Sequence, residues 1–287
     1  MRQVIQRGKR THFVSTSSNP TRMRTGLSIF LVCFLIGIAI LLTILFTQPP
    51  PPFIFDPNQT FSNKSLAIIQ VENYSLLKYT IAAQHRWDRI ILNSTFPLVI
   101  QIQSNQTYCG EGLSWSHSFN SSKVMVRIRL EDASLFMGNT LGTAESCLTD
   151  TQGFVRMGMI RISTKVMDLY PTKVIDIITH ELGHVLGLGV LWESRKLIQG
   201  FSYIGSGGRR GLLAIGGTGD PLLEDLGGAS TEKTHWRSTE YPNELMSGVR
   251  GTADSLLESD AISLLTVYAL MDLGYSVNRS NADPYHL

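Results

Sequence analysis

The chain has 287 residues, of which 43% are hydrophobic and 17% charged, and its formal net charge is +2. These values exclude a chain too small to bury a full core, and they are typical of one globular domain with an added apolar segment. Residues 1–26 carry basic charges only, because the first acidic residue is Asp56. A basic tail can bind nucleic acid. The apolar segment that follows favours a membrane instead, so we expect no nucleic-acid partner.

That apolar segment, residues 27–46, contains twenty residues without a charge. At about 1.5 Å per residue, it is long enough to cross a hydrocarbon core of about 30 Å. A cleaved signal peptide is the main alternative, but its apolar part has about 7–15 residues and ends at small residues. We therefore predict a single-pass type II protein whose basic side stays in the cytosol. Its parts are a tail over 1–26, a transmembrane signal anchor over 27–46, a proline-rich spacer over 47–60 and an extracellular or lumenal domain over 61–287.

In the first half of the domain, several segments have alternating apolar residues, which are typical of strands. One segment has apolar residues at the spacing of a helix. Strands are expected at 68–74, 98–103, 124–130 and 158–163, and a helix at 76–92.

The second half begins with a helix that opens at Pro171 and runs to about Gly187 or Gly189. Residues 200–228 contain ten glycines, so we expect mostly loop there, with a short helical turn near 212–215. A last helix is predicted from about Asp260 to Leu273, with Gly274 as its C-terminal cap. This order of elements predicts an α+β or mixed α/β fold, and of the two we expect α+β with a mixed sheet.

Two features fit an oxidising, glycosylating compartment. Cys109 and Cys147 remain as a pair once Cys33 is placed in the anchor, so a disulfide between them is plausible. Asn-x-Ser/Thr sequons occur seven times, where chance gives about two, and all follow the anchor. We predict glycosylation at Asn58, Asn63, Asn73, Asn93, Asn105, Asn120 and Asn278.

The sequence HELGH at 180–184 has the pattern of a zinc-dependent hydrolase. His180 and His184 lie one helical turn apart, so both imidazoles can reach one zinc ion at about 2.0–2.1 Å. Glu181 points about 100° further around the helix, where it can take a proton from a water activated by the metal. The motif therefore predicts two metal ligands and a general base.

A catalytic zinc usually has three protein ligands, and Val190 stands where many such proteins carry the third histidine. The residues alone leave this third ligand open. The candidates are Glu193, Asp220, Glu224, Asp225 and His235.

The sequence HELGHVLG, a long insertion, then HW and NELMSG resembles the leishmanolysin branch of the metzincin zinc peptidases. The resemblance implies a metzincin-like domain with a twisted mixed sheet, an active-site helix and a C-terminal helix. It implies His235 as third zinc ligand, Met246 as the Met-turn beneath the metal and Gly187 as a sharp turn after the helix. It also implies that residues 158–163 form the edge strand on which a substrate pairs.

We therefore expect a membrane-anchored zinc endopeptidase with one catalytic Zn²⁺, acting on a protein or peptide substrate. The alternative is a catalytically silent adhesion or binding module that keeps a structural zinc. The complete HELGH sequence favours the enzyme, because a silent site has no evident need for Glu181.

Overall fold

In a computed structural model of the chain, the described residues all lie within residues 53–287, one of two units into which the chain divides. The predicted tail, anchor and spacer, and the sequons at Asn58, Asn63 and Asn105, lie outside the described residues. Within the described part, no helix is long and apolar enough to cross a membrane. The structure describes residues 65–93, 95–103, 106, 108–109, 118–248 and 259–287.

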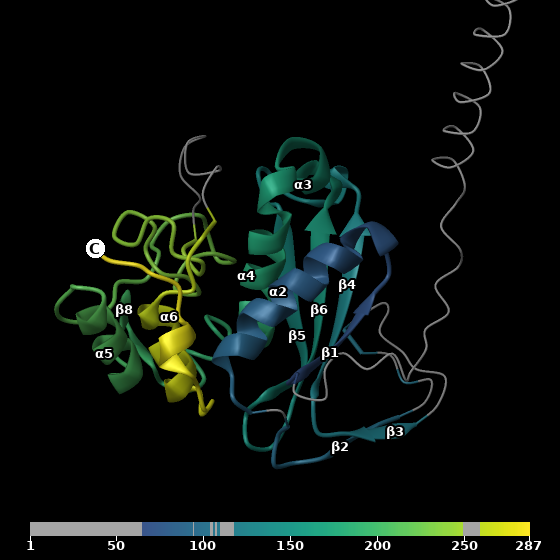
Figure 1. Cartoon of the computed structure of the whole chain (residues 1–287), viewed down its shortest axis with the longest axis horizontal. Coiled ribbons are helices and arrows are strands. Elements are labelled where there is room, and N and C mark those ends of the chain that lie inside the picture. Colours follow the sequence, from purple (N-terminus) through teal and green to yellow (C-terminus); the bar gives the residue numbers. More distant parts are fainter. Residues whose placement is uncertain (1–64, 94, 104–105, 107, 110–117, 249–258) are drawn as a thin grey trace, which may run out of the picture. The chain divides into compact units, whose positions relative to one another are not determined.

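A four-stranded mixed sheet forms the centre of the first half of the domain (Figure 1). Its spatial order is β1 (Ala67–Val71), β4 (Val124–Glu131), β6 (Val155–Ser163) and β5 (Gly142–Thr149). The first three strands are parallel, and β5 pairs antiparallel with β6. With helices on the sheet and beyond it, the prediction of an α+β domain with a mixed sheet is confirmed.

The predicted edge strand was wrong. Residues 158–163 belong to β6, which lies between β4 and β5, so β5 forms that edge of the sheet. Strand β5 has the sequence GTAESCLT and no residue in it is fully buried. It therefore lacks the apolar alternation by which a half-buried strand is recognised, and no strand was predicted there.

Strand alternation divides the core between the two faces of the sheet. On one face, residues such as Val126 and Ile160 pack with α2 (Leu77–Ile90) and α4 (Val174–Val185). On the other face, Met125, Met157 and Met159 pack with Ile102 and Cys109. This second cluster lies beside the hairpin of β2 (Ile100–Ile102) and β3 (Phe119–Ser121).

The described structure joins Cys109 and Cys147 in a disulfide whose Cα atoms are 4.8 Å apart. Cys147 lies in β5 and Cys109 in the second core cluster. The bond therefore ties the edge strand to the segment that covers the back of the sheet.

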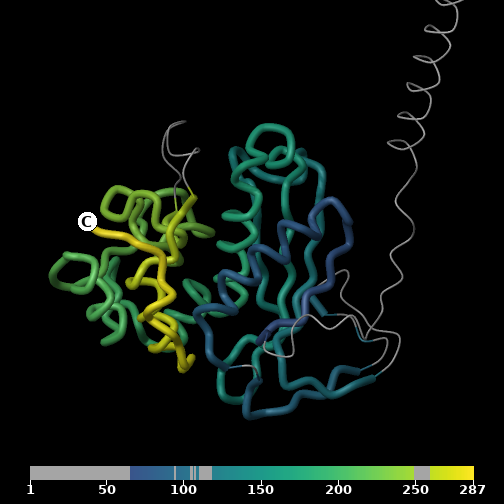
Figure 2. Tube along the Cα trace, viewed as in Figure 1, coloured from purple at the N-terminus to yellow at the C-terminus, as the bar shows by residue number. Residues whose placement is uncertain are grey.

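The C-terminal region, residues 186–248 and 259–287, lies on the side of α4 away from the sheet in the trace (Figure 2). It contains the pair β7 (Ile198–Gln199) and β8 (Ser202–Tyr203) and the helices α5 (Ser206–Ala214) and α6 (Leu264–Asp272). The smaller elements of the domain are η1 (Tyr74–Leu76), η2 (Ala133–Leu135), α3 (Thr164–Leu169), η3 (Pro171–Lys173) and η5 (Arg279–Asn281).

The glycine-rich segment contains a helix where mostly loop was expected. Glycine disfavours helix by about 1 kcal/mol, which is why the sequence reads as loop. A Cβ at Gly207 would lie 2.3 Å from the carbonyl oxygen of Tyr268, and one at Gly211 would lie 2.7 Å from that of Leu264. The glycines thus let α5 pack directly against the backbone of α6.

The last helix also starts later than predicted. Helix α6 begins at Leu264 because Ser263 caps it, accepting a hydrogen bond from the amide of Thr266. Its end agrees with the prediction, since Gly274 follows with φ +95°.

Candidate metal centre

Helix α4 carries the HELGH sequence and is buried on almost every side. Its first turn is anchored by Asp176, which forms ion pairs with Arg86 at 2.8 Å and Lys173 at 3.4 Å. The helix ends at Val185, and Gly187 turns the chain with φ +102°. A side chain at Gly187 would meet Leu191 at 2.6 Å, so the turn needs glycine for space as well as for conformation.

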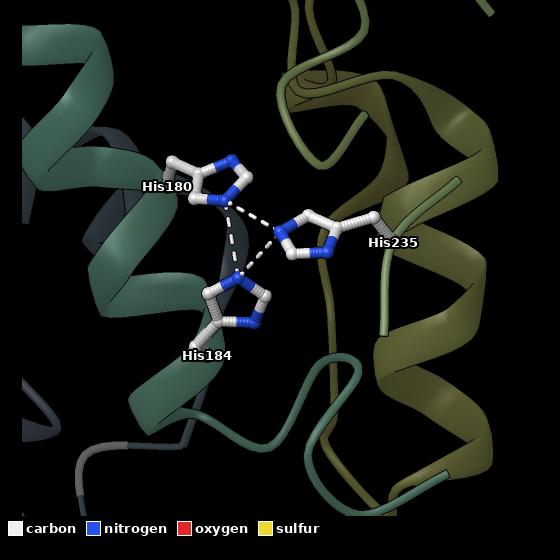
Figure 3. Close-up of side chains that lie close together, drawn as sticks. All are labelled: His180, His184 and His235. Atoms are coloured by element: carbon white, nitrogen blue, oxygen red, sulfur yellow. Dashed lines mark hydrogen bonds between the residues drawn. The ribbon is translucent and has the colours of Figure 1, made fainter. Parts of the chain in front are cut away.

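Three histidine side chains converge on one point in the structure (Figure 3). The Nε2 atoms of His180 and His184 are 3.0 Å apart, those of His184 and His235 are 3.0 Å apart, and those of His180 and His235 are 3.1 Å apart. Each residue is less than a tenth exposed. Two of the rings come from α4 and the third comes from the C-terminal region.

The other ring nitrogen of each histidine faces a backbone carbonyl. His180 Nδ1 lies 2.6 Å from the oxygen of Leu245, His184 Nδ1 lies 2.9 Å from that of Leu188, and His235 Nδ1 lies 3.0 Å from that of Thr231. A carbonyl oxygen only accepts, so each Nδ1 carries the hydrogen and each Nε2 presents a lone pair. Burial lowers the pKa of His184, which also favours the neutral ring.

Three lone pairs that face one another at these distances repel unless a cation lies between them. Tetrahedral zinc at about 2.0–2.1 Å from each nitrogen requires donors roughly 3.3–3.4 Å apart, a few tenths of an ångström more than observed. Backbone acceptors behind each ring are also typical of metal-binding histidines. The three side chains therefore fit a metal ion.

His235 reaches this point because the segment that carries it lies against the turn after α4. Gly189 has φ +75°, and a Cβ there would lie 2.0 Å from the carbonyl oxygen of Thr234. The next residue, Trp236, is fully buried, and its ring lies 4.5 Å from that of Trp192. Only glycine at 189 lets the two segments approach so closely.

The structure brings none of the four acidic candidates for the third ligand into the histidine cluster. Glu193 is exposed, and Asp220 and Asp225 pair with arginines. The carboxylate of Glu224 accepts hydrogen bonds from Ser238 and from the backbone of Asp225 and Leu226. Among the described residues, the group with metal-binding geometry is His180, His184 and His235.

Met246 packs directly against α4 between the two histidines of the helix. A Cβ at Gly183 would lie 2.7 Å from Met246 Sδ, so the sulfur rests on the bare backbone of the helix. Met246 is fully buried, and its carbonyl accepts a hydrogen bond from the amide of Trp236 at 3.0 Å. The methionine thus touches both the helix and the segment that carries His235.

Glu181 is buried against the start of the edge strand. A Cβ at Gly142, the first residue of β5, would lie 2.8 Å from Glu181 Oε1 and 3.1 Å from Ile177 Cγ2. The φ angle of Gly142 lies outside the left-handed region, so the backbone does not require glycine there, but a side chain at 142 would make the Glu181 carboxylate shift. Sequence reasoning missed this residue, because nothing local separates it from the other glycines of the chain.

The sequons within the described part lie at accessible positions. Asn73 and Asn120 are exposed, and Asn93 and Asn278 are half-buried. The side-chain oxygens of Asn73, Asn93 and Asn278 accept backbone hydrogen bonds, which leaves the nitrogen that a glycan would use pointing elsewhere. Their glycosylation stays a prediction.

Part of the chain is similar in sequence to a leishmanolysin homolog. It is 28% identical to a leishmanolysin homolog of Crithidia fasciculata over 160 residues, which cover 50% of this chain and 23% of that relative. The chain thus spans less than a quarter of the relative that it matches. No protein-family model matches the chain. Together with the histidine cluster, this partial similarity suggests a metalloprotease.

Proposed function

We propose that this protein is a leishmanolysin-like zinc endopeptidase with a metzincin-type domain, which hydrolyses peptide bonds of protein or peptide substrates. The observation that carries the proposal is the convergence of three buried Nε2 atoms within 3.1 Å of one another, with Glu181 on the same helix. The partial similarity to a leishmanolysin homolog supports it.

In this proposal His180, His184 and His235 hold one Zn²⁺. Three neutral histidine nitrogens are a ligand set that a catalytic zinc takes in proteins, with water or substrate as the fourth ligand. When bound, zinc supplies a Lewis acid that brings the pKa of a water molecule toward about 7 and polarises the peptide carbonyl. Met246 supports the site from below as a packed, apolar floor.

Glu181 is the general base. It takes the proton from the attacking water as the new C–O bond forms, and returns it to the amine nitrogen as the C–N bond breaks. The backbone of Gly142 lies beside its carboxylate and limits the positions that the carboxylate can take.

The substrate strand pairs with the outer edge of β5. Among the described strands, β5 pairs with β6 alone, and its first residue touches the general base. A peptide added antiparallel to this edge would pass Glu181 at the Gly142 end. The disulfide at Cys147 holds the other end of the same strand.

The proposed setting of the enzyme rests on sequence features. We propose that residues 27–46 anchor the chain in a membrane and that the zinc domain lies in an extracellular or lumenal space. The seven sequons and the Cys109–Cys147 pair support such a compartment.

The test is the Glu181→Gln variant of the full-length chain, with Glu193→Gln as the matched control, since Glu193 is an exposed acid beyond the helix. Loss of the general base is expected to lower kcat/KM on a casein-type substrate by roughly 10²–10⁴-fold, with one zinc retained. Glu193→Gln should cleave like the wild type.

Cleavage by Glu181→Gln at the wild-type rate would overturn the mechanism. A wild-type protein that binds zinc but cleaves no peptide would favour the adhesion module instead.

A further inference from the structure

Glu244 is a buried carboxylate close to the site that the proposed mechanism does not use. It is 2% exposed and precedes Leu245 and Met246. Four donors surround it: the amide of Met246 at 2.5 Å, the amide and hydroxyl of Ser263 at 3.3 and 2.7 Å, and the hydroxyl of Thr266 at 2.6 Å. A carboxylate with this many donors is held in one position.

The first connection runs from Glu244 to His180. The bond from the amide of Met246 to Glu244 Oε2 closes a tight ring around Leu245. The amide of Leu245 also donates to the carbonyl of Ala261 at 2.8 Å, so both sides of this residue are fixed. The carbonyl of Leu245 then points at His180 Nδ1, 2.6 Å away.

The second connection runs from Glu244 to the segment of His235. The hydroxyl of Thr266 donates to Glu244 Oε1 and accepts from the indole nitrogen of Trp236 at 2.9 Å. The amide of Trp236 donates to the carbonyl of Met246 at 3.0 Å. Trp236, the residue after His235, is therefore linked to the Glu244 carboxylate. The same carboxylate holds the Leu245 carbonyl that faces His180.

Capping of α6 alone does not explain a glutamate at this position. Ser263 already caps the helix through its own hydroxyl, as serine commonly does. Burying a carboxylate costs free energy, and burial here raises the pKa of Glu244 to about 7 despite the four donors. An apolar residue would avoid that cost, but it could not accept from Met246 and Thr266 together.

We propose that Glu244 is a positioning residue that fixes two of the three histidines of the metal site with respect to each other. It holds the Leu245 carbonyl behind His180, and through Thr266 it holds Trp236 beside His235. This inference rests on the proposed metal site and not on the proteolytic activity.

The experiment compares three variants of the full-length chain by their zinc affinity, measured by competition with a chromogenic chelator, and by the absorption spectrum of bound Co²⁺. Glu244→Gln keeps the shape but turns one acceptor into a donor. Thr266→Val and Ser263→Ala each remove one hydroxyl bond to Glu244 Oε1, but only Thr266 connects to Trp236.

Loss of an outer-sphere partner typically weakens metal affinity by about 10–100-fold. We expect that loss for Glu244→Gln, about tenfold for Thr266→Val with a shifted Co²⁺ spectrum, and a change within about twofold for Ser263→Ala. Unfolding experiments should show that Ser263→Ala still lowers stability, since it removes a helix cap.

The proposal is overturned if all three variants bind zinc like the wild type, or if Ser263→Ala weakens binding as much as Thr266→Val. Should Glu244→Gln fail to fold, the matched pair of hydroxyl variants decides alone. A wild type that binds zinc without cleaving peptides contradicts the proposed function and leaves these affinities as the test. A wild type that binds no metal overturns both.

Discussion

Helix α4 and the C-terminal region deliver histidines to the same point by different means. In α4, one turn of helix places His180 and His184 on a common face, and the spacing of four residues is sufficient for that. His235 lies 51 residues after His184, on a segment without regular structure that is held by a glycine contact, two tryptophans and short backbone bridges.

The difference shows which part of such a site is vulnerable. The geometry of the α4 pair follows from backbone hydrogen bonds within twelve residues. The position of His235 depends on the packing of the whole C-terminal region, so a change far from the metal in sequence can displace it. The following changes should separate these two contributions.

The largest effect is expected from removing a histidine of either region. His184→Ala and His235→Ala should both lose stoichiometric zinc, measured as metal content after gel filtration, because each takes away one of three donors. Glu193→Ala is the control, since that exposed acid was the rival third ligand. Zinc lost in Glu193→Ala but kept in His235→Ala would reverse the assignment.

Gly189→Ala should disturb the C-terminal region and leave α4 intact. The new Cβ would meet the Thr234 carbonyl at 2.0 Å in a left-handed backbone, so we expect the free energy of unfolding to fall by roughly 2–6 kcal/mol. Gly200→Ala is the control, because Gly200 has φ +61° and open space around it. Equal losses in the two variants would show that backbone strain alone acts at Gly189.

The pH dependence of stability should report on Glu244. Burial raises its folded-state pKa to about 7, so the folded state keeps the proton while the unfolded chain releases it from about pH 4.5. The stabilisation is therefore complete at low pH and is lost as pH rises toward 7, by on the order of 3 kcal/mol.

The measurement is chemical denaturation of metal-stripped protein across this pH range, with Glu244→Gln for comparison. The difference in unfolding free energy between the two proteins should change between pH 4.5 and 7. A difference that stays constant over this interval would contradict the raised pKa.

The smallest effect is expected from Gly142→Ala. This change in β5 tests whether the sheet positions the Glu181 carboxylate of α4. The methyl group would push on the Glu181 carboxylate, so we expect kcat to fall roughly tenfold, or about 1.4 kcal/mol in barrier, while KM and zinc content stay close to wild type. Gly138→Ala is the control for kcat, since a Cβ there would meet no atom within 4 Å and its φ of +58° makes backbone strain the whole cost. A rise in KM with unchanged kcat would assign Gly142 to substrate binding instead.

Local patterns in the sequence were sufficient to predict the helices and strands whose apolar residues recur with a clear helical or strand period. The helix of the HELGH sequence, the helix at 77–90 and the strands β1, β4 and β6 were all expected near their observed positions. Two elements were not predicted because their sequences are rich in glycine or in polar residues. Helix α5 and strand β5 have little intrinsic preference for their structures, and tertiary contacts with α6 and β6 stabilise them.

The sequence by itself determined that His180, Glu181 and His184 share one buried helix, since that follows from a period of 3.6 residues. It left five candidates for a third ligand, because nothing local relates position 184 to position 235. Tertiary structure alone placed His235 beside the helix, and it also put Gly142 against Glu181 and Glu244 behind two histidines. Such contacts join residues far apart in the chain, so they depend on the folding of the whole domain.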